Sequence, residues 1–277
     1  MGIPQSLFRP DGDFFLIAGP CVLEDERTNF AIAREVARIG ERFGIPVVFK
    51  ASFDKANRSS IASPRGPGLE AGLRLLDSLK AEFGIPLTTD IHLPEQAAPA
   101  AAVVDVLQIP AFLSRQTDLL VAAAQTGRAL NLKKGQWMAP QDMALQVDKA
   151  RQSGARSVAV TERGTAFGYH NLVVDMRSFA LIKESCACPA IFDASHSVQL
   201  PGAAGAKSGG EPHYIPLLAA GAIAAGANAV FVEVHPEPAR ALSDGSSMLR
   251  LDRLENLVAR VLAVRDALSE EREASDA

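Results

Sequence analysis

The segment from residue 50 to residue 60 concentrates side chains that suit phosphate. It carries three cations, three hydroxyls and one acid in eleven residues: Lys50, Lys55, Arg58, Ser52, Ser59, Ser60 and Asp54. A solvated loop carries mixed charge, whereas ammonium, guanidinium and hydroxyl groups together are donors to phosphate oxygens. The segment follows the apolar run Ile45–Phe49, which is typical of a buried strand. We therefore predict a site for phosphorylated small molecules at the carboxyl end of that strand.

A second cationic group consists of Lys133 and Arg163, each of which follows another apolar run. If the two runs are neighbouring strands, the two cations can clamp one phosphate. The alternative is two surface cations whose stems lie along apolar surface with their charges in water. Two separate cationic groups in a mildly acidic chain suggest two anionic substrates, or one bisphosphate.

Four potential metal ligands also follow apolar runs. Cys21, His196, Glu233 and Asp244 supply a thiol, an imidazole and two carboxylates, a mixed set suited to a divalent transition metal such as Mn, Fe, Zn or Co. Taken singly, each has a simpler explanation, because a buried cysteine is usually an inert small hydrophobe and a lone histidine usually a satisfied polar residue. The residues alone leave both explanations open.

Eight short apolar runs recur, and most are continuous rather than alternating, as in parallel strands covered on both faces. They are Phe14–Ala18, Pro46–Phe49, Pro86–Thr89, Val103–Ile109, Ala129–Leu132, Ser157–Val160, Ala190–Phe192 and Ala229–Val232. Helical patterns over Thr28–Arg42 and Leu69–Phe83 are each followed by the same joint, Phe-Gly-Ile-Pro, in which Gly suits a helix cap and Pro the start of a strand.

This repeat of about 40 residues predicts a single-domain α/β fold over residues 1–277, a (β/α)8 or TIM barrel. The alternative is a doubly wound open sheet, but Gly66–Gly72 does not match the dinucleotide fingerprint of such folds. The segment Ala203–Pro212 is predicted to be a mobile loop over the site, and residues 269–277 a frayed tail.

In a barrel the active site lies at the carboxyl ends of the strands, and ionisable or polar groups follow all eight runs. A barrel built for stability alone would not place them there, because a buried charge without a partner costs several kcal/mol. Substrate anions would supply the missing partners. Among these groups, Asp90 and His196 are candidates for proton transfer.

Composition excludes several classes of function. The 277 residues carry a net charge of −4, with a pI near 5.8 and only one Trp and two Tyr, which argues against a nucleic-acid surface. No run approaches the roughly 18 apolar residues of a membrane span, and the first residues do not form a secretory signal. Three cysteines cannot all pair, and we expect a cytoplasmic protein in which Cys186 and Cys188 are structural.

The motifs around these residues resemble the 3-deoxy-D-manno-octulosonate 8-phosphate (Kdo-8-phosphate) synthase family. In chain order they are GPCVLE (19–24), FKASFDKANRSS (49–60), RGPGLE (65–70), TTDIH (88–92), QIPAFLSRQTDLL (108–120), KKGQ (133–136), RG (163–164), NLVVDM (171–176), FDASHSVQLPG (192–202), EVHPEP (233–238) and SDG (243–245). The resemblance covers nearly the whole chain. It implies a homotetrameric barrel that condenses phosphoenolpyruvate with D-arabinose 5-phosphate, toward the Kdo of lipopolysaccharide.

Roles follow from this resemblance, motif by motif. The phosphoenolpyruvate residues are expected to be Lys50, Gln108, Pro110, Ala111, Phe112, Lys133 and Arg163, and Gln199 joins the substrate-binding set. The pentose-phosphate residues are expected to be Asn57, Arg58 and Ser59. Lys55, Asp90, His196 and Asp244 are the expected catalytic residues. The family has metal-independent members with Asn in place of Cys21, so Cys21 implies the metal-dependent class, with His196, Glu233 and Asp244 as further ligands.

Two other functions compete with this prediction. The first is 3-deoxy-arabino-heptulosonate 7-phosphate synthase, which applies the same chemistry to erythrose 4-phosphate, but which has Pro-Arg-Thr chemistry where this chain has KANRSS. The second is a phosphosugar-binding protein on a barrel that has lost activity. That alternative predicts binding without turnover, and the apparently complete residue set argues against it.

Overall fold

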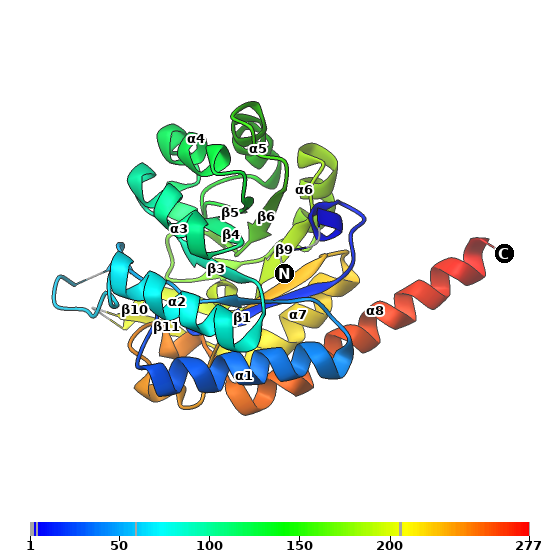
Figure 1. Cartoon of the computed structure of the whole chain (residues 1–277). Helices are drawn as coiled ribbons and strands as arrows, with labels where there is room; N and C mark the ends of the chain where they lie inside the picture. Colours follow the sequence, from blue (N-terminus) through cyan, green and yellow to red (C-terminus); the bar gives the residue numbers. More distant parts are fainter. Residues whose placement is uncertain (1–2, 4, 59, 205–206, 277) are drawn as a thin grey trace.

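Eight parallel strands form a closed barrel, with helices on its outside, in a computed structural model that describes residues 3, 5–58, 60–204 and 207–276 (Figure 1). Each strand pairs with the next along the chain, and β1 pairs with β12 to close the barrel. The strands are β1 (Phe15–Gly19), β2 (Val47–Lys50), β3 (Leu87–Asp90), β4 (Val106–Ile109), β5 (Ala129–Lys133), β6 (Val158–Glu162), β9 (Ala190–Asp193) and β12 (Ala229–His235). The predicted (β/α)8 barrel is confirmed, and the open sheet is wrong because the two end strands pair.

Most strands extend past the predicted apolar run to include the first polar residue after it. Thus β2 ends at Lys50, β3 at Asp90 and β5 at Lys133, all of them buried. The hydrogen bonds between neighbouring strands therefore fix the backbone of these residues directly. The run Val103–Ile109 is wrong at its start, since Val103 closes a helix and the strand begins at Val106.

The helices alternate with the strands and cover the barrel. They are α1 (Glu26–Phe43), α2 (Leu69–Phe83), α3 (Ala97–Val103), α4 (Thr117–Gln125), α5 (Met143–Gln152), α6 (Ser178–Cys186), α7 (Ile215–Ala224) and α8 (Leu254–Asp276). Helix α1 starts before the predicted Thr28 because the Asp25 side chain caps it by accepting from the Thr28 amide at 2.9 Å. The predicted cap Gly44 has φ 62°, in the left-handed region.

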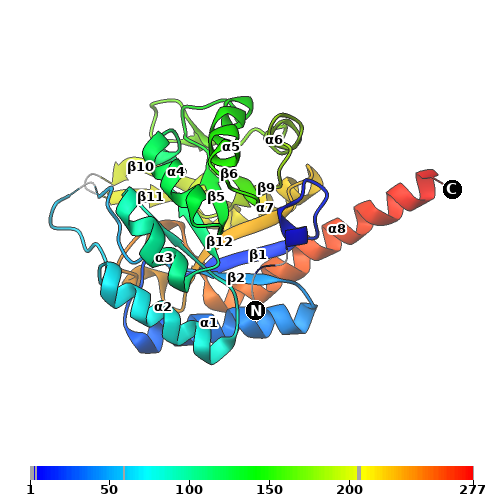
Figure 2. The same cartoon turned by 45° about the horizontal axis from the view of Figure 1, so that its top comes forward.

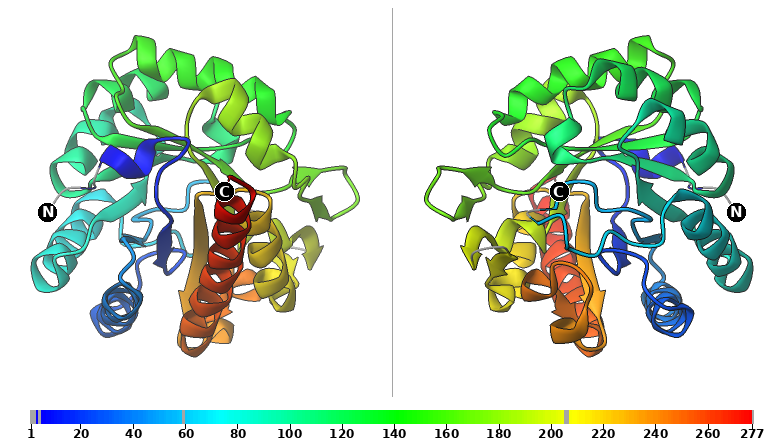
Figure 3. Two further views of the ribbon diagram at one scale, coloured as in Figure 1. Left: turned by 90° about the vertical axis from the view of Figure 1, so that its right-hand side faces the viewer. Right: turned by 90° about the vertical axis from the view of Figure 1, so that its left-hand side faces the viewer.

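Helix α8 projects from the barrel, and its last turns stand clear of the other helices (Figures 1 and 2). Figure 3 shows the barrel from two opposite sides, with the C-terminal end of α8 toward the viewer in the left view. The segment 269–277 falls in these last turns up to Asp276, and its fraying stays a prediction.

Short strands at the carboxyl end add two hairpins that the sequence did not reveal. They are β7 (Thr165–Ala166) with β8 (Leu172–Val173), and β10 (Gln199–Ala204) with β11 (Lys207–Gly210); β13 (Leu249–Arg250) extends the sheet beside β12. The prediction of a loop over Ala203–Pro212 is wrong where β10 and β11 pair, and its mobility stays a prediction. Its small residues suit close packing: a Cβ on Gly210 would lie 2.5 Å from the Ser246 carbonyl oxygen.

The amino end of the barrel interior is closed by apolar side chains. Leu7, from the short 3-10 helix Gln5–Phe8, packs there with the barrel residues Phe15, Ile17, Val48, Ala159, Ile191, Ala229 and Phe231. Because apolar side chains fill this end, the polar groups inside the barrel gather at the opposite end.

None of the helices in the described part of the chain is long and apolar enough to cross a membrane.

Candidate active site

A cavity of about 1230 Å³ opens at the carboxyl ends of the strands, where the site was predicted. Its lining includes most of the predicted site residues: Lys50, Lys55, Asn57, Arg58, Asp90, Gln108, Pro110, Ala111, Phe112, Lys133, Arg163, His196, Gln199 and Asp244. Cys21 and Glu233 lie behind this wall with no exposed surface. Ser59 lies outside the described residues. The structure therefore brings the predicted groups together around one space.

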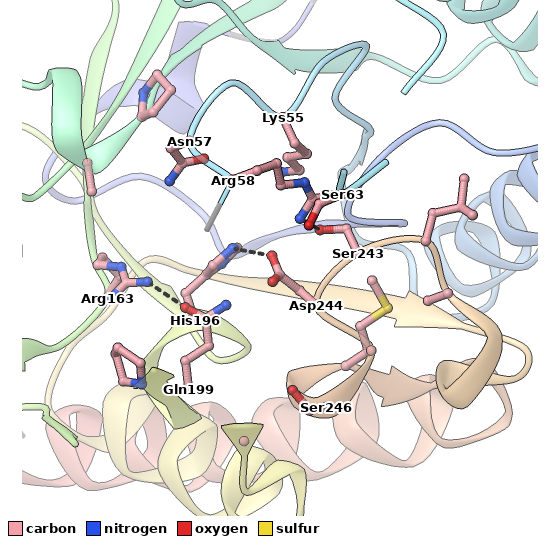
Figure 4. Close-up of a pocket in the computed structure, with 18 of the residues that line it drawn as sticks. Lys55, Asn57, Arg58, Ser63, Arg163, His196, Gln199, Ser243, Asp244 and Ser246 are labelled. Atoms are coloured by element: carbon pink, nitrogen blue, oxygen red, sulfur yellow. Dashed lines mark hydrogen bonds and ion pairs between the residues drawn. The ribbon is translucent and has the colours of Figure 1, made fainter. Parts of the chain in front are cut away.

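The segment after β2 crosses one side of the cavity (Figure 4). Its course is fixed by Arg58, whose Nε donates to the Pro64 carbonyl at 2.8 Å and whose Nη1 donates to Ser243 Oγ at 2.6 Å. The remaining nitrogen, Nη2, is buried without a hydrogen-bond partner among the described residues. Arg58 thus keeps a donor available for an anion.

Lys55 lies on the same side, buried, with its Nζ 3.5 Å from Asp90 Oδ2. Burial alone would lower the pKa of Lys55, but Cys21, Asp90 and other acidic groups outweigh it and raise that pKa well above its ordinary value. Lys55 is therefore a permanent positive charge at the cavity wall.

Lys133 and Arg163 form the second cationic corner, at the ends of β5 and β6. Lys133 forms a short ion pair with Asp193 and lies 3.8 Å from the centre of the Phe231 ring. Arg163 donates from Nη2 to Gln199 Oε1 at 3.0 Å, while its Nη1 is buried without a partner in the described part of the chain (Figure 4). Burial lowers the pKa of both cations. The corner is thus desolvated and still has a free donor.

Three predicted metal ligands form one cluster at the cavity wall, with Asp244 in the lining and the other two behind it. The ligand atoms of Cys21, Glu233 and Asp244 lie within 4.8 Å of one another, and Cys21 Sγ is 3.2 Å from Asp244 Oδ2. Burial, Asp244 and Glu233 raise the pKa of the Cys21 thiol well above its ordinary value. Burial alone would raise the pKa of Glu233, but Lys50 and other cations outweigh it and lower it to about 2.

His196 completes this cluster from the cavity side. Its Nε2 lies 3.8 Å from Glu233 Oε1 and 3.9 Å from Asp244 Oδ2. Its Nδ1 lies 2.8 Å from Asp193 Oδ2, so the carboxylate accepts the Nδ1 proton and leaves the Nε2 lone pair free on the cluster side. The imidazole therefore faces both carboxylates of the cluster.

Two functional neighbours had no role assigned from the sequence. Asp193 accepts hydrogen bonds from both His196 and Lys133. Burial alone would raise the pKa of Asp193, but these two partners outweigh burial and hold that pKa far below its ordinary range. Ser243 lies 3.1 Å from Cys21 Sγ and accepts the hydrogen bond from Arg58. The role of Asp193 could have been predicted from its position at a strand end. No sequence pattern around Ser243 indicates that it connects Cys21 to Arg58.

Backbone contacts position the cluster. A Cβ on Gly19 would lie 2.0 Å from the Lys50 carbonyl oxygen, so only glycine allows β1 to approach β2 there, two residues before Cys21. Asp244 has φ 52°, and a Cβ on the next residue, Gly245, would lie 2.1 Å from the Pro238 carbonyl oxygen. A non-glycine residue at positive φ within a cavity wall is typical of functional sites.

A closed (β/α)8 barrel whose rim gathers buried cations around one cavity is the architecture of an enzyme that acts on anionic substrates. The chain belongs to the DAHP synthetase I family, which it matches over residues 7–270.

Eight curated relatives, 50 to 54% identical to this chain, share the name 2-dehydro-3-deoxyphosphooctonate aldolase. A relative from Synechococcus sp. is 54% identical over 255 residues, covering 92% of this chain and 89% of the relative. One from Syntrophotalea carbinolica is 52% identical, covering 90% of each chain. One from Nitratidesulfovibrio vulgaris strain DP4 is 54% identical, covering 90% of this chain and 91% of the relative. The similarity thus extends through the whole barrel.

Proposed function

We propose that this protein is a Kdo-8-phosphate synthase, which condenses phosphoenolpyruvate with D-arabinose 5-phosphate and water. The products are 3-deoxy-D-manno-octulosonate 8-phosphate and phosphate, and the reaction serves lipopolysaccharide synthesis. The name shared by relatives 50 to 54% identical to this chain supports the assignment. The observation that carries it in the structure is the pair of separated cationic groups, each with a buried free donor, on one cavity.

The reaction places two repelling polyanions in contact, and this explains the density of cations. The enol carbon of phosphoenolpyruvate attacks the sugar aldehyde, water adds at the carbon that bears the phosphate ester, and phosphate leaves by C–O cleavage. We assign the phosphoenolpyruvate end to Lys133 and Arg163, beside Gln108 and the 110–112 segment. Asn57 and Arg58, with Ser59, take the pentose phosphate, and Lys55 lies between the two substrates.

We further propose that the enzyme belongs to the metal-dependent class, with Cys21, His196, Glu233 and Asp244 as ligands. The residues fit a divalent cation: Glu233 Oε2 is buried and lacks a hydrogen-bond partner among the described residues. The Nε2 of His196 also faces two carboxylates without a short hydrogen bond to either. When bound, the metal would orient and polarise the aldehyde or a water. Asp193 would hold the imidazole, and Lys50, whose Nζ lies 2.6 Å from Glu233 Oε1, would orient the carboxylate.

The homotetramer implied by the resemblance is also a proposal, as is the cytoplasm as its location. Large exposed apolar side chains around the rim support an assembly, because they would otherwise face water: Phe112, Trp137, Phe167 and Tyr169. Light scattering of the purified protein tests it, and a monomer mass would contradict it.

The substrate assay tests the main proposal. The protein is incubated with phosphoenolpyruvate and either arabinose 5-phosphate or erythrose 4-phosphate, and phosphate release is measured. We expect kcat/KM to favour the pentose phosphate. Preference for erythrose 4-phosphate would assign the heptulosonate reaction, which the relatives support less, and tight binding without release would assign a binding protein.

A further inference from the structure

Five buried side chains form a continuous series of hydrogen bonds inside the barrel, called here the polar line. Its members are Thr161, Asn131, Gln108, Asp90 and Ser52. Thr161 Oγ1 donates to Asn131 Oδ1 at 2.6 Å, and Asn131 Nδ2 donates to Gln108 Oε1 at 2.9 Å. Gln108 Nε2 donates to Asp90 Oδ1 at 2.5 Å, and the Ser52 hydroxyl makes a short hydrogen bond to Asp90 Oδ2. The line thus spans the ladder from β6 to the residues just after β2.

The register of the barrel explains this alignment. Asp90 is the direct partner of Gln108 on β4, and Gln108 is the direct partner of Asn131 on β5. Thr161 stands two residues beyond Ala159, the partner of Asn131, and therefore points to the same side of β6. Its own partner on β9 is the apolar Ile191, so the line ends at the threonine.

The donors and acceptors in the line allow one direction only. An ionised Asp90 accepts hydrogen bonds and cannot donate, so Gln108 must present its NH₂ group to it. The Gln108 oxygen then faces Asn131, which must present its own NH₂, and the Asn131 oxygen in turn requires the Thr161 hydroxyl. Rotating either amide by half a turn would place oxygen against oxygen. Asp90 therefore sets the direction of the line, and Asn131, supported by Thr161, holds the Gln108 amide in that orientation from its other side.

We propose that Asn131 and Thr161 are positioning residues, which fix the Gln108 amide and the Asp90 carboxylate for the condensation. This inference rests on the proposed function for its kinetic readout. Neither residue lines the cavity, whereas Gln108 and Asp90 both do, so the two act through the line rather than on substrate.

The line also defines what Asp90 does. Its carboxylate receives Gln108, Ser52 and Lys55, so its lone pairs are largely occupied by fixed donors. Burial alone would raise the pKa of Asp90, but Lys55 and Lys50 outweigh it and lower that pKa well below its ordinary value. Asp90 is therefore a fixed counter-charge for Lys55.

The first test removes the central link with Asn131→Leu, which is similar in size. The matched control is Thr88→Val: Thr88 is fully buried on β3, and its hydroxyl has no hydrogen-bond partner among the described residues. We expect kcat to fall between about tenfold and 100-fold in Asn131→Leu, as for misplaced active-site groups, with the KM for phosphoenolpyruvate within about twofold. The control should retain kcat. Equal kcat in Asn131→Leu and the unaltered protein would overturn the proposal.

The second test uses Asn131→Asp, which is nearly isosteric and separates positioning from packing. The new carboxyl can donate to Gln108 only when protonated, and it accepts from Thr161 in either form. We expect kcat near that of the control at low pH and a fall with rising pH through the carboxyl's pKa, which burial raises above about 4. A residue that only packs would give a pH profile parallel to that of the unaltered protein, and this result would overturn the proposal.

A third readout does not depend on turnover. Crystal structures of Asn131→Leu and Thr88→Val, without substrates, should show Gln108 turned away from Asp90 in the first and unchanged in the second. An unmoved Gln108 in Asn131→Leu would refute the positioning role even if the condensation assay failed. Failure of the unaltered protein to turn over would refute only the proposed function.

Discussion

Buried polar groups are paired differently in the two halves of the barrel mouth. From β2 to β6, the polar line joins neutral amides and hydroxyls to one carboxylate, and each of its five members has a partner. Along β9 and β12, carboxylates pair directly with lysines that reach them from other strands: Glu233 on β12 with Lys50 of β2, and Asp193 on β9 with Lys133 of β5. In that half, Glu233 Oε2 has no hydrogen-bond partner in the described part of the chain.

The comparison shows that a complete network and an incomplete one serve different purposes. A satisfied neutral network specifies one geometry and has little affinity left for ligands. A charged network with an unused acceptor, beside cations with unused donors, retains affinity for a cation and for anions. We infer that the polar line sets geometry, whereas the charged groups and the cations with unused donors bind ligands.

The largest expected effect on activity is that of removing a bound metal ion from the charged half. Dialysis of the protein against a strong chelator should lower turnover by about 10³-fold or more, because the charged half then lacks the cation its ligands are arranged to hold. Added Mn²⁺ should restore the rate. Thermal unfolding before and after dialysis shows whether the fold is kept. Full turnover in a sample verified as metal-free would place the enzyme in the metal-independent class despite Cys21.

Asp193→Asn should destabilise the charged half by about 3–5 kcal/mol, because Lys133 would stay buried without its counter-charge. Urea unfolding measures the change in the free energy of unfolding. The matched control is Asp175→Asn, which removes an exposed pair with Arg177 and should change little. Equal changes in the free energy of unfolding would mean that the buried Lys133–Asp193 pair stabilises the fold no more than the exposed pair does.

Arg163→Lys should raise the KM for phosphoenolpyruvate about tenfold, with a smaller effect on kcat, because an ammonium cannot replace the planar donor pair. Steady-state kinetics with the pentose phosphate at saturation measures it. Arg250→Lys, at an exposed position of the cavity rim, is the control and should leave this KM unchanged. An equal rise in this KM for both variants would contradict a specific role for the planar guanidinium of Arg163.

The smallest effect should come from a pair outside both halves. The hydrogen bond from Arg65 lowers the pKa of Asp54 below its ordinary value. A lowered folded pKa means that the contribution of the pair is present above the unfolded pKa of about 4 and is lost as pH falls through the lower folded value. Protection of the Lys55 amide, which donates to the Arg65 carbonyl, should therefore drop about threefold or less below pH 4.

Hydrogen exchange corrected for intrinsic rates measures this drop. In Asp54→Asn, the protection should be lower at neutral pH and independent of pH in this range. A pH-dependent loss of the same size in that variant would assign the effect to another group.

Local patterns predicted the barrel because each strand carries its own signal. Continuous apolar runs located all eight barrel strands, and the Gly44 and Gly84 caps marked the ends of α1 and α2. The β10–β11 hairpin was missed because its alanines and glycines carry no strand signal and are ordered by pairing and by contact with residue 246.

The sequence predicted the residues of the site better than it predicted the contacts between them. Strand-end positions identified Lys133 and Arg163, since the ends of parallel strands meet at one rim. The link from Ser243 to Arg58 joins residues 185 positions apart, and the alignment of Gln108 with Asn131 depends on sheet register. Neither can be read from spacing along the chain.

The close approach of Gly19 to the Lys50 carbonyl has a practical consequence for engineering. This close approach, together with the backbone hydrogen bonds between residues 21–23 and Ser52, joins Cys21 to the start of the pentose-phosphate segment, so neither can be moved without displacing the other. A mutant library that varies residue 19 would fail at both of these places at once. A library that holds residue 19 constant leaves the far rim, around Phe112 and Gln199, free to be varied without moving either of them.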